Sequence, residues 1–222
     1  MKNRMNKFKS LLLIMLCVIL VVPCLARMDV SAATQRQKAM AAYKKWLSTS
    51  TIRVAAKGTR YFDMQTYTSR TYNGTRSGNV KFAIANIDND GVPELIIYTK
   101  VGWNNIYGIL TYKNGRIYRV YSYAGDGRLM GYYKATGYFF MRAYSDGTPF
   151  TDSYYRIYGT SIKRNFTKFD YGYGGEADYT VGKTDVSKST FVSKIRKAVQ
   201  YKKKTVPTYY SNTAGNRSAH LR

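Results

Sequence analysis

Two residue types that carry much of protein chemistry are nearly missing from this chain of 222 residues, which has two cysteines and one histidine. Both cysteines, Cys17 and Cys24, lie in the N-terminal segment 1–33, and His220 is the third residue from the end. If segment 1–33 is removed, disulfides, thiol catalysis and Cys-ligated zinc are all excluded. A single terminal histidine also argues against a Ser-His-Asp triad and against His-ligated zinc.

Acidic residues are scarce as well. The chain has 12 Asp and Glu against 36 Lys and Arg, and residues 34–222 keep a net charge of +20. A positive field of this strength favours polyanionic surroundings. Outside a cell these are teichoic acid-like wall polymers, anionic glycans, phospholipid head groups and stray nucleic acid. We expect an anionic wall polymer or glycan as partner and no specific nucleic acid; the alternative is that scattered Lys and Arg serve only solubility.

Segment 1–33 predicts an export signal. The basic start MKNRMNKFKS precedes the apolar run LLLIMLCVILVVPCLA and the small residues VSAA, the order of a secretory signal peptide, cleaved here after Ala32 or Ala33. The apolar run is short for a span of about 20 residues. We therefore expect a secreted or extracellular cell-surface protein with no membrane span after cleavage. A retained anchor and lipidation of Cys24 are the alternatives.

Residues 34–222 are expected to form one domain that opens with a helix. The stretch over residues 34–48 places Met40, Tyr43 and Leu47 on one side and basic residues opposite, the pattern of an amphipathic helix. A turn-rich segment with short strands follows. Residues 80–181 then alternate β-forming runs with turn signals such as Asn114-Gly115, which is typical of a hairpin. A run over residues 177–182 is expected to be the last strand.

The chain closes with a second predicted helix and a tail. Residues 187–203 repeat apolar side chains at Phe191, Ile195 and Val199, with Ser187 as the candidate N-cap. The tail over residues 205–222 either packs back or frays. Two amphipathic helices flanking an antiparallel β-meander give an α+β fold.

The predicted meander is rich in tyrosine, of which the chain has 23. Tyrosine suits half-buried strands and cross-strand pairs, and it also suits a platform on which sugars stack. β-Propensity alone explains the residues, so the structural interpretation is favoured.

The stretch NIDNDGVPELII, residues 86–97, concentrates three of the scarce acids within seven positions. If Asn86 is counted as position 1, side-chain oxygen donors follow at position 3 (Asp88), position 5 (Asp90) and position 9 (Glu94). The main-chain carbonyl of Val92 is at position 7. Gly91 at position 6 permits a sharp bend, as in loops that bind calcium. Position 12 is Ile97 and not Glu, so this is not an EF-hand, and an affinity of roughly 10⁻⁴ to 10⁻³ M is expected. A plain turn is the alternative.

The same stretch, extended to FAIANIDNDGVPELII, resembles the FG-GAP/VCBS-type motif, in which an apolar strand leads into an acidic loop and a second apolar strand. Residues 34–222 as a whole resemble small exported proteins of clostridia-like Gram-positive bacteria, with an AYKKWL helix, a TYKNGRI hairpin and an NTAGN tail. The resemblance implies calcium at Asn86, Asp88, Asp90, Val92 and Glu94. Asn86 stands where the motif has Asp, and a single loop in a chain of this length cannot build a multi-bladed propeller.

Catalytic patterns are few. No phosphate-binding glycine motif is present. A glycosidase needs two carboxyl groups across a cleft, and with Glu94 assigned to the loop only Glu176 with Asp178 or Asp170 is left. The sequence therefore predicts an exported, non-catalytic, calcium-braced interaction module, and the alternative is a secreted hydrolase that uses these carboxylates.

Overall fold

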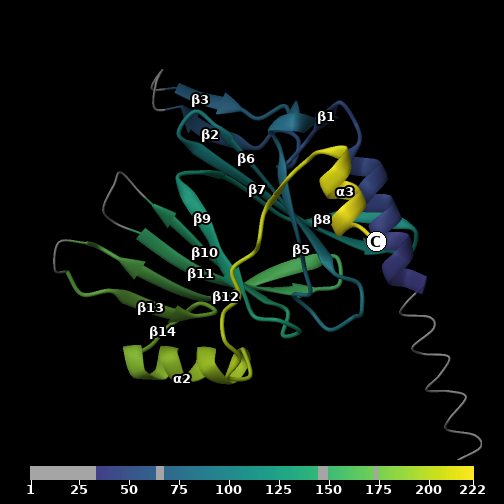
Figure 1. Cartoon of the computed structure of the whole chain (residues 1–222). Helices are drawn as coiled ribbons and strands as arrows, with labels where there is room; N and C mark the ends of the chain where they lie inside the picture. The colour runs from purple at the N-terminus through teal and green to yellow at the C-terminus, as the bar shows by residue number, and fades with distance from the viewer. Residues whose placement is uncertain (1–33, 64–67, 145–149, 173–174) are drawn as a thin grey trace, which may run out of the picture.

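The computed structural model describes residues 34–63, 68–144, 150–172 and 175–222. The predicted signal peptide, with Cys17 and Cys24, lies outside the described residues. The described chain is an α+β domain with antiparallel sheets between an N-terminal helix and C-terminal helices, which confirms the predicted class (Figure 1). Within the described ranges, no helix is long and apolar enough to cross a membrane.

Two antiparallel sheets carry the predicted meander. The first has the order β15-β5-β6-β7-β8, with β5 (Lys81–Ala85), β6 (Glu94–Val101), β7 (Asn104–Lys113), β8 (Arg116–Gly125) and β15 (Tyr210–Ser211). The second has the order β14-β13-β12-β11-β10-β9, with β9 (Gly127–Tyr132), β10 (Tyr138–Tyr144), β11 (Phe150–Tyr158), β12 (Ser161–Asp170), β13 (Asp178–Val181) and β14 (Thr184–Asp185). The expected single meander is thus divided in two.

The division falls at a corner formed by Gly125, Asp126 and Gly127. Gly125 has a φ of +153°, and a Cβ on Gly127 would lie 2.4 Å from the hydroxyl oxygen of Tyr123. Glycine therefore lets the chain leave the edge of the first sheet and enter the second within a single residue.

Buried side chains form a core on each side of each sheet. Leu95 and Ile97 of β6 face the helix over residues 34–47, where they pack with Tyr43 and Leu47 of that helix. Alternate residues of β6 point the other way, so Ile96 packs between the two sheets with Phe139. Because the middle of β6 is buried on both faces, the run from Leu95 to Tyr98 is continuously apolar and not alternating.

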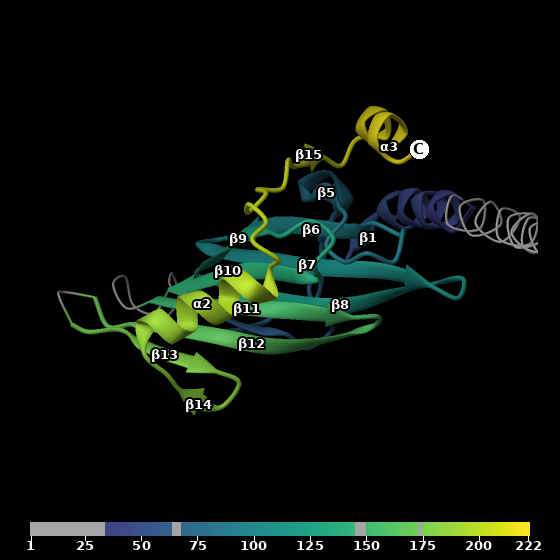
Figure 2. The same cartoon turned by 90° about the horizontal axis from the view of Figure 1, so that it is seen from below.

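The helix α2 (Lys188–Ala198) covers the far face of the second sheet, where Phe191 and Ile195 pack with Phe166. Figure 2 shows α2 over this sheet, with the chain leaving its end toward β15. Ser187 accepts a hydrogen bond from the Thr190 N–H, so the predicted N-cap is confirmed. The helix ends short of the predicted position 203, because Gln200 and Tyr201 take positive φ values of 53° and 56°.

The tail packs back onto the domain. β15 pairs with β5, and α3 (Ala214–His220) lies beside the helix over residues 34–47 (Figure 1). The Asn212 amide donates to the carbonyls of Leu47 and Ser77. The prediction that residues 177–182 form the last strand is therefore wrong, since β14 and β15 follow.

Short elements fill the segment between the first helix and β5. They form two two-stranded sheets and one turn of 3₁₀ helix: β1 (Thr51–Ile52) with β4 (Thr75–Arg76), β2 (Arg60–Asp63) with β3 (Thr68–Thr71), and η1 (Ser77–Asn79).

Candidate metal centre

The acidic loop connects β5 to β6 and lies where three layers of the fold meet. From the turn between β9 and β10, the Ala135 N–H donates to the Asn86 carbonyl, and the N–H groups of Thr136 and Gly137 donate to the Ile87 carbonyl. From the first helix, the Tyr43 hydroxyl donates to the Pro93 carbonyl over 3.1 Å. The loop is thus attached to the N-terminal helix, to its own sheet and to the second sheet.

Hydrogen bonds within the loop form a tight turn. The Asp90 N–H donates to Asp88 Oδ1 over 3.2 Å, and the Val92 N–H donates to Asp90 Oδ1 over 2.8 Å. Gly91 has a φ of +81°, a conformation that a side chain would strain. These bonds account for Asp88 and Asp90 as turn residues, but they leave Glu94 unexplained.

Glu94 is the first residue of β6 and its exposed fraction is 0 %. Its Oε2 accepts a hydrogen bond from the Ile87 N–H over 2.8 Å. Its Oε1 is enclosed and has no hydrogen-bond partner among the described residues. A buried polar atom without a partner is destabilising in either protonation state.

Asp88, Asp90 and Glu94 each place one carboxylate oxygen within 4.8 Å of the other two. Two oxygens bound to the same Ca²⁺ lie up to about 5.2 Å apart, because Ca–O distances are about 2.3–2.6 Å. The three acids that the sequence singled out are therefore close enough to share one ion. Across the described ranges, they are the one group of three or more acidic, His or Cys side chains with this spacing.

Burial and crowding change the proton affinity of Asp88 and Glu94. Burial raises the pKa of Asp88 to about 6, and the charge of Asp90 contributes to the shift. Burial also raises the pKa of Glu94 well above its usual value, helped by the charge of Asp88. The Tyr43 hydroxyl has a raised pKa, first from burial and then from these carboxylates. A divalent cation relieves this kind of repulsion because it pairs with every member.

The other two predicted ligands, Asn86 and Val92, differ in burial and in their hydrogen bonds. Asn86 is half-buried and its main-chain carbonyl accepts from Ala135. Val92 is buried in the core beneath the first helix, and its N–H bonds to Asp90. The sequence pattern missed Tyr43 and the turn at residues 135–137, because both approach the loop from distant positions in the chain.

A second group of carboxylates lines a cavity of about 760 Å³ between β12, β13 and the start of α2. It contains all three residues of the predicted hydrolase alternative, Asp170, Glu176 and Asp178, together with Asp185. Lys168 Nζ lies 2.6 Å from Asp170 and lowers the pKa of that carboxyl. Asp178 accepts a hydrogen bond from the Tyr171 hydroxyl.

Comparison of the chain with protein-family models, curated proteins and solved structures finds no match in any of the three. The resemblance of the acidic loop to the FG-GAP/VCBS-type motif stays a prediction from the sequence.

Proposed function

We propose that this protein is an exported, non-catalytic interaction domain whose acidic loop binds one calcium ion. The observation that carries the proposal is the Glu94 carboxylate, which is fully buried with an unpartnered Oε1 beside Asp88 and Asp90. A cation held by the three carboxylates supplies the missing partner. Tyr43 of the first helix and the turn at residues 135–137 already hydrogen-bond to the loop, so the cation would also stabilise the contacts between these layers.

The chemistry of the donors favours calcium among common ions. All the donors are carboxylate or carbonyl oxygens, which suit hard cations, and no sulfur or imidazole belongs to the group. An irregular loop that mixes side-chain and main-chain oxygens fits the flexible coordination of Ca²⁺ better than the strict octahedron of Mg²⁺. Asn86 and the Val92 carbonyl remain the proposed additional ligands.

The interaction role follows from the charge. Residues 34–222 carry +20, and the predicted signal peptide directs them outside the cell. A strongly cationic exported domain associates with anionic polymers at a cell surface. The calcium ion has a structural part in this proposal, because it braces the fold that presents the basic surface.

Terbium luminescence tests the ion site directly. Tb³⁺ occupies calcium sites, and here it would lie close to Tyr43, which can sensitise its emission when the tyrosines are excited. We expect emission that about 10 mM Ca²⁺ displaces and that is lost in Asp88→Asn and Asp90→Asn. Asp185→Asn is the matched control because its carboxylate is exposed and distant in sequence. Equal emission from all four proteins would contradict the proposal.

A hydrolase is the second candidate, and the cavity lined by Asp170, Glu176 and Asp178 favours it. Two features weigh against it. Asp170 is paired with Lys168 and its pKa is lowered, which excludes it as the general acid and leaves that role to Glu176. Asp178 and Glu176 are exposed and not enclosed in a dry site.

Turnover assays on wall polysaccharide and on polyol-phosphate polymer separate the two candidates. We expect no product above a blank from the wild-type protein and no difference with Glu176→Gln. Product formation that Glu176→Gln abolishes would establish the hydrolase instead.

A further inference from the structure

The helix α2 uses only one side for packing. Phe191 and Ile195 are buried against the second sheet, where the Phe191 ring makes edge contacts with Tyr154 and Phe166. The apolar side of α2 is therefore covered by the domain itself and is not available to another surface.

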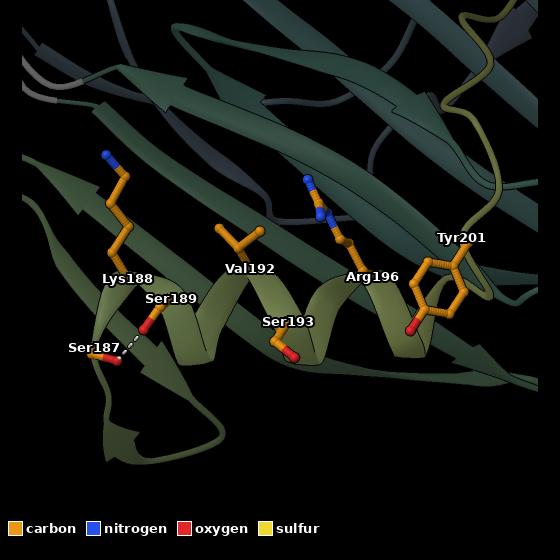
Figure 3. Close-up of a pocket in the computed structure, with 7 residues that line it drawn as sticks. All are labelled: Ser187, Lys188, Ser189, Val192, Ser193, Arg196 and Tyr201. Carbon is orange, nitrogen blue, oxygen red and sulfur yellow. Dashed lines mark hydrogen bonds between the residues drawn. The ribbon is translucent and has the colours of Figure 1, made fainter.

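A second side of α2 faces solvent and is hollowed. A depression of about 770 Å³ runs along the helix, lined by Lys188, Val192 and Arg196, by three serines, and by Tyr201 at its end. Figure 3 shows Lys188, Val192 and Arg196 extending from one side of the helix, with Tyr201 beyond its last turn. Residues four apart share one side of a helix, so the sequence spacing produces this row. We call this depression the α2 groove.

The α2 groove carries two cationic side chains, Lys188 and Arg196, and its Lys188 end adjoins the cavity that four carboxylates line. Within the part of the chain that the structure describes, neither Lys188 nor Arg196 belongs to an ion pair. The sequence from Val186 to the C-terminus contains nine Lys and Arg and no Asp or Glu. Tyr201, at the end of the groove, is 72 % exposed although it is a large ring.

The spacing of the charges indicates the kind of ligand. Lys188 and Arg196 are eight residues apart, which is about 12 Å along a helix. Two cations at this separation suit a ligand with repeated negative charges better than one small anion. The Val192 side chain lies between them, and the hydroxyl of Ser193 lines the same depression, which suits a chain of alternating polar and aliphatic groups.

We propose that the α2 groove binds a linear polyol-phosphate polymer, with phosphodiester groups on Lys188 and Arg196. Arginine pairs with phosphate through two parallel hydrogen bonds, and lysine binds it as a point charge. The Tyr201 ring closes one end of the groove and offers a surface for the aliphatic part of the chain. This inference rests on the interaction half of the proposed function and is independent of the calcium ion.

Two other polyanions fit the groove less well. A helix that lies on a membrane inserts its apolar side, and here that side is buried in the domain. Sites for single-stranded nucleic acid use several aromatic rings on which bases stack, whereas the α2 groove has one, Tyr201.

Binding of purified poly(glycerol phosphate) by titration calorimetry or fluorescence anisotropy tests the proposal on residues 34–222. Lys188→Gln with Arg196→Gln removes two groove charges. Lys44→Gln with Lys45→Gln removes two exposed charges from the first helix, which packs on the other sheet. We expect the groove variant to lose at least about tenfold in affinity and to flatten the salt dependence, and the control to lose about twofold or less.

Measurements in calcium and in chelator keep this proposal separate from the calcium site. Binding that survives chelator on a folded protein, as judged by circular dichroism, supports the groove even if no ion binds. Equal losses in the two double variants would show that only net charge matters and would overturn the groove. Equally tight binding of anionic phospholipid vesicles or of a single-stranded oligonucleotide at the same salt concentration would overturn the polyol-phosphate assignment.

Discussion

At the scale of single residues, Glu94 is the position that a plain turn leaves unexplained. Asp88 and Asp90 satisfy loop N–H groups, as acidic residues in turns do. Glu94 lies at the start of a buried strand, with one oxygen on the Ile87 N–H and the other without a partner among the described residues. The proposed ion would supply the partner that this oxygen lacks.

Replacing Glu94 by glutamine separates the two explanations. Glutamine keeps the size and the bond to Ile87 but removes the charge that calcium needs. We expect Glu94→Gln to be at least as stable as wild type in chelator, because a buried charge next to Asp88 is lost. In calcium we expect the stabilisation to disappear.

Thermal unfolding with and without calcium measures both effects. Glu176→Gln makes the same chemical change at an exposed site and serves as the control. A Glu94→Gln protein that calcium still stabilises as strongly as wild type would contradict the assignment of Glu94 as a ligand.

Acidity gives a second residue-scale prediction. The pKa of Asp88 is raised to about 6, above the value of about 3.9 in an unfolded chain. Between these values the folded, ion-free protein binds more protons than the unfolded chain, so its stability falls as the pH rises through this window. Calcium binds ionised carboxylates, so the stabilisation that calcium provides increases as the pH rises through the same window.

We therefore expect the calcium-induced shift in melting temperature to be large near pH 7.5 and small near pH 5. Melting curves with calcium and with chelator at about pH 5, 6 and 7.5 measure it. The Asp185→Asn protein should follow wild type. A shift that is the same at all three pH values would contradict titration of the site carboxylates.

At the scale of elements, a close crossing fixes how the segment after the first helix lies on β7 and β8. The carbonyl oxygen of Val54 lies 2.1 Å from the place that a Cβ on Gly108 would occupy. Arg119 donates to the Val54 and Arg53 carbonyls. Gly108 is thus required because another backbone occupies its side-chain position.

Gly108→Ala is expected to destabilise the domain by about 1–3 kcal/mol, because backbone must move to admit one methyl group. Gly78→Ala is the control, since a Cβ there meets nothing within 4 Å. Chemical denaturation of both variants measures the difference. Equal stability of the two would show that the segment over residues 53–56 shifts freely.

Elements that depend on local sequence were predicted, and those that depend on contacts between distant segments were not. Local patterns predicted the first helix, the strands β5 to β13 and the N-cap at Ser187, because each depends on neighbours in the chain. The three clustered carboxylates were predicted for the same reason. The corner at Gly125 to Gly127 and the attachment of the tail were not predictable, because they depend on contacts between distant segments.

At the scale of the whole molecule, the C-terminal tail attaches to both sheets and to the first helix. It leaves α2, bonds to the edge of the second sheet where Thr205 pairs with Tyr132, and then extends the first sheet as β15. Asn212 is buried and donates to carbonyls of Leu47 and Ser77. Leu221 completes the core beneath the first helix.

Asn212→Ala is expected to lower the free energy of unfolding by about 1–3 kcal/mol, because the buried bond to the Leu47 carbonyl and the part-buried bond to the Ser77 carbonyl are both lost. Asn216→Ala is the control, since its side-chain amide donates to the Ser211 carbonyl, which belongs to the tail itself. Denaturant unfolding compares the two. Equal losses would mean that the tail is attached by its backbone pairing alone.

The proposed calcium site belongs to the same scale, because the loop touches the first helix and both sheets. An ion bound there would stabilise the contacts between layers as well as the turn. By binding linkage, about 10 mM calcium with a dissociation constant of roughly 10⁻⁴ to 10⁻³ M adds about 1.4–2.7 kcal/mol. For a domain of this size that is roughly 3–10 °C in melting temperature.

The most direct measurement is thermal unfolding of residues 34–222 in about 10 mM calcium and in chelator, for wild type and for Asp90→Asn. We expect a rise of roughly 3–10 °C with calcium for wild type and a rise below about 1 °C for the variant. Equal melting temperatures for wild type in calcium and in chelator would contradict it.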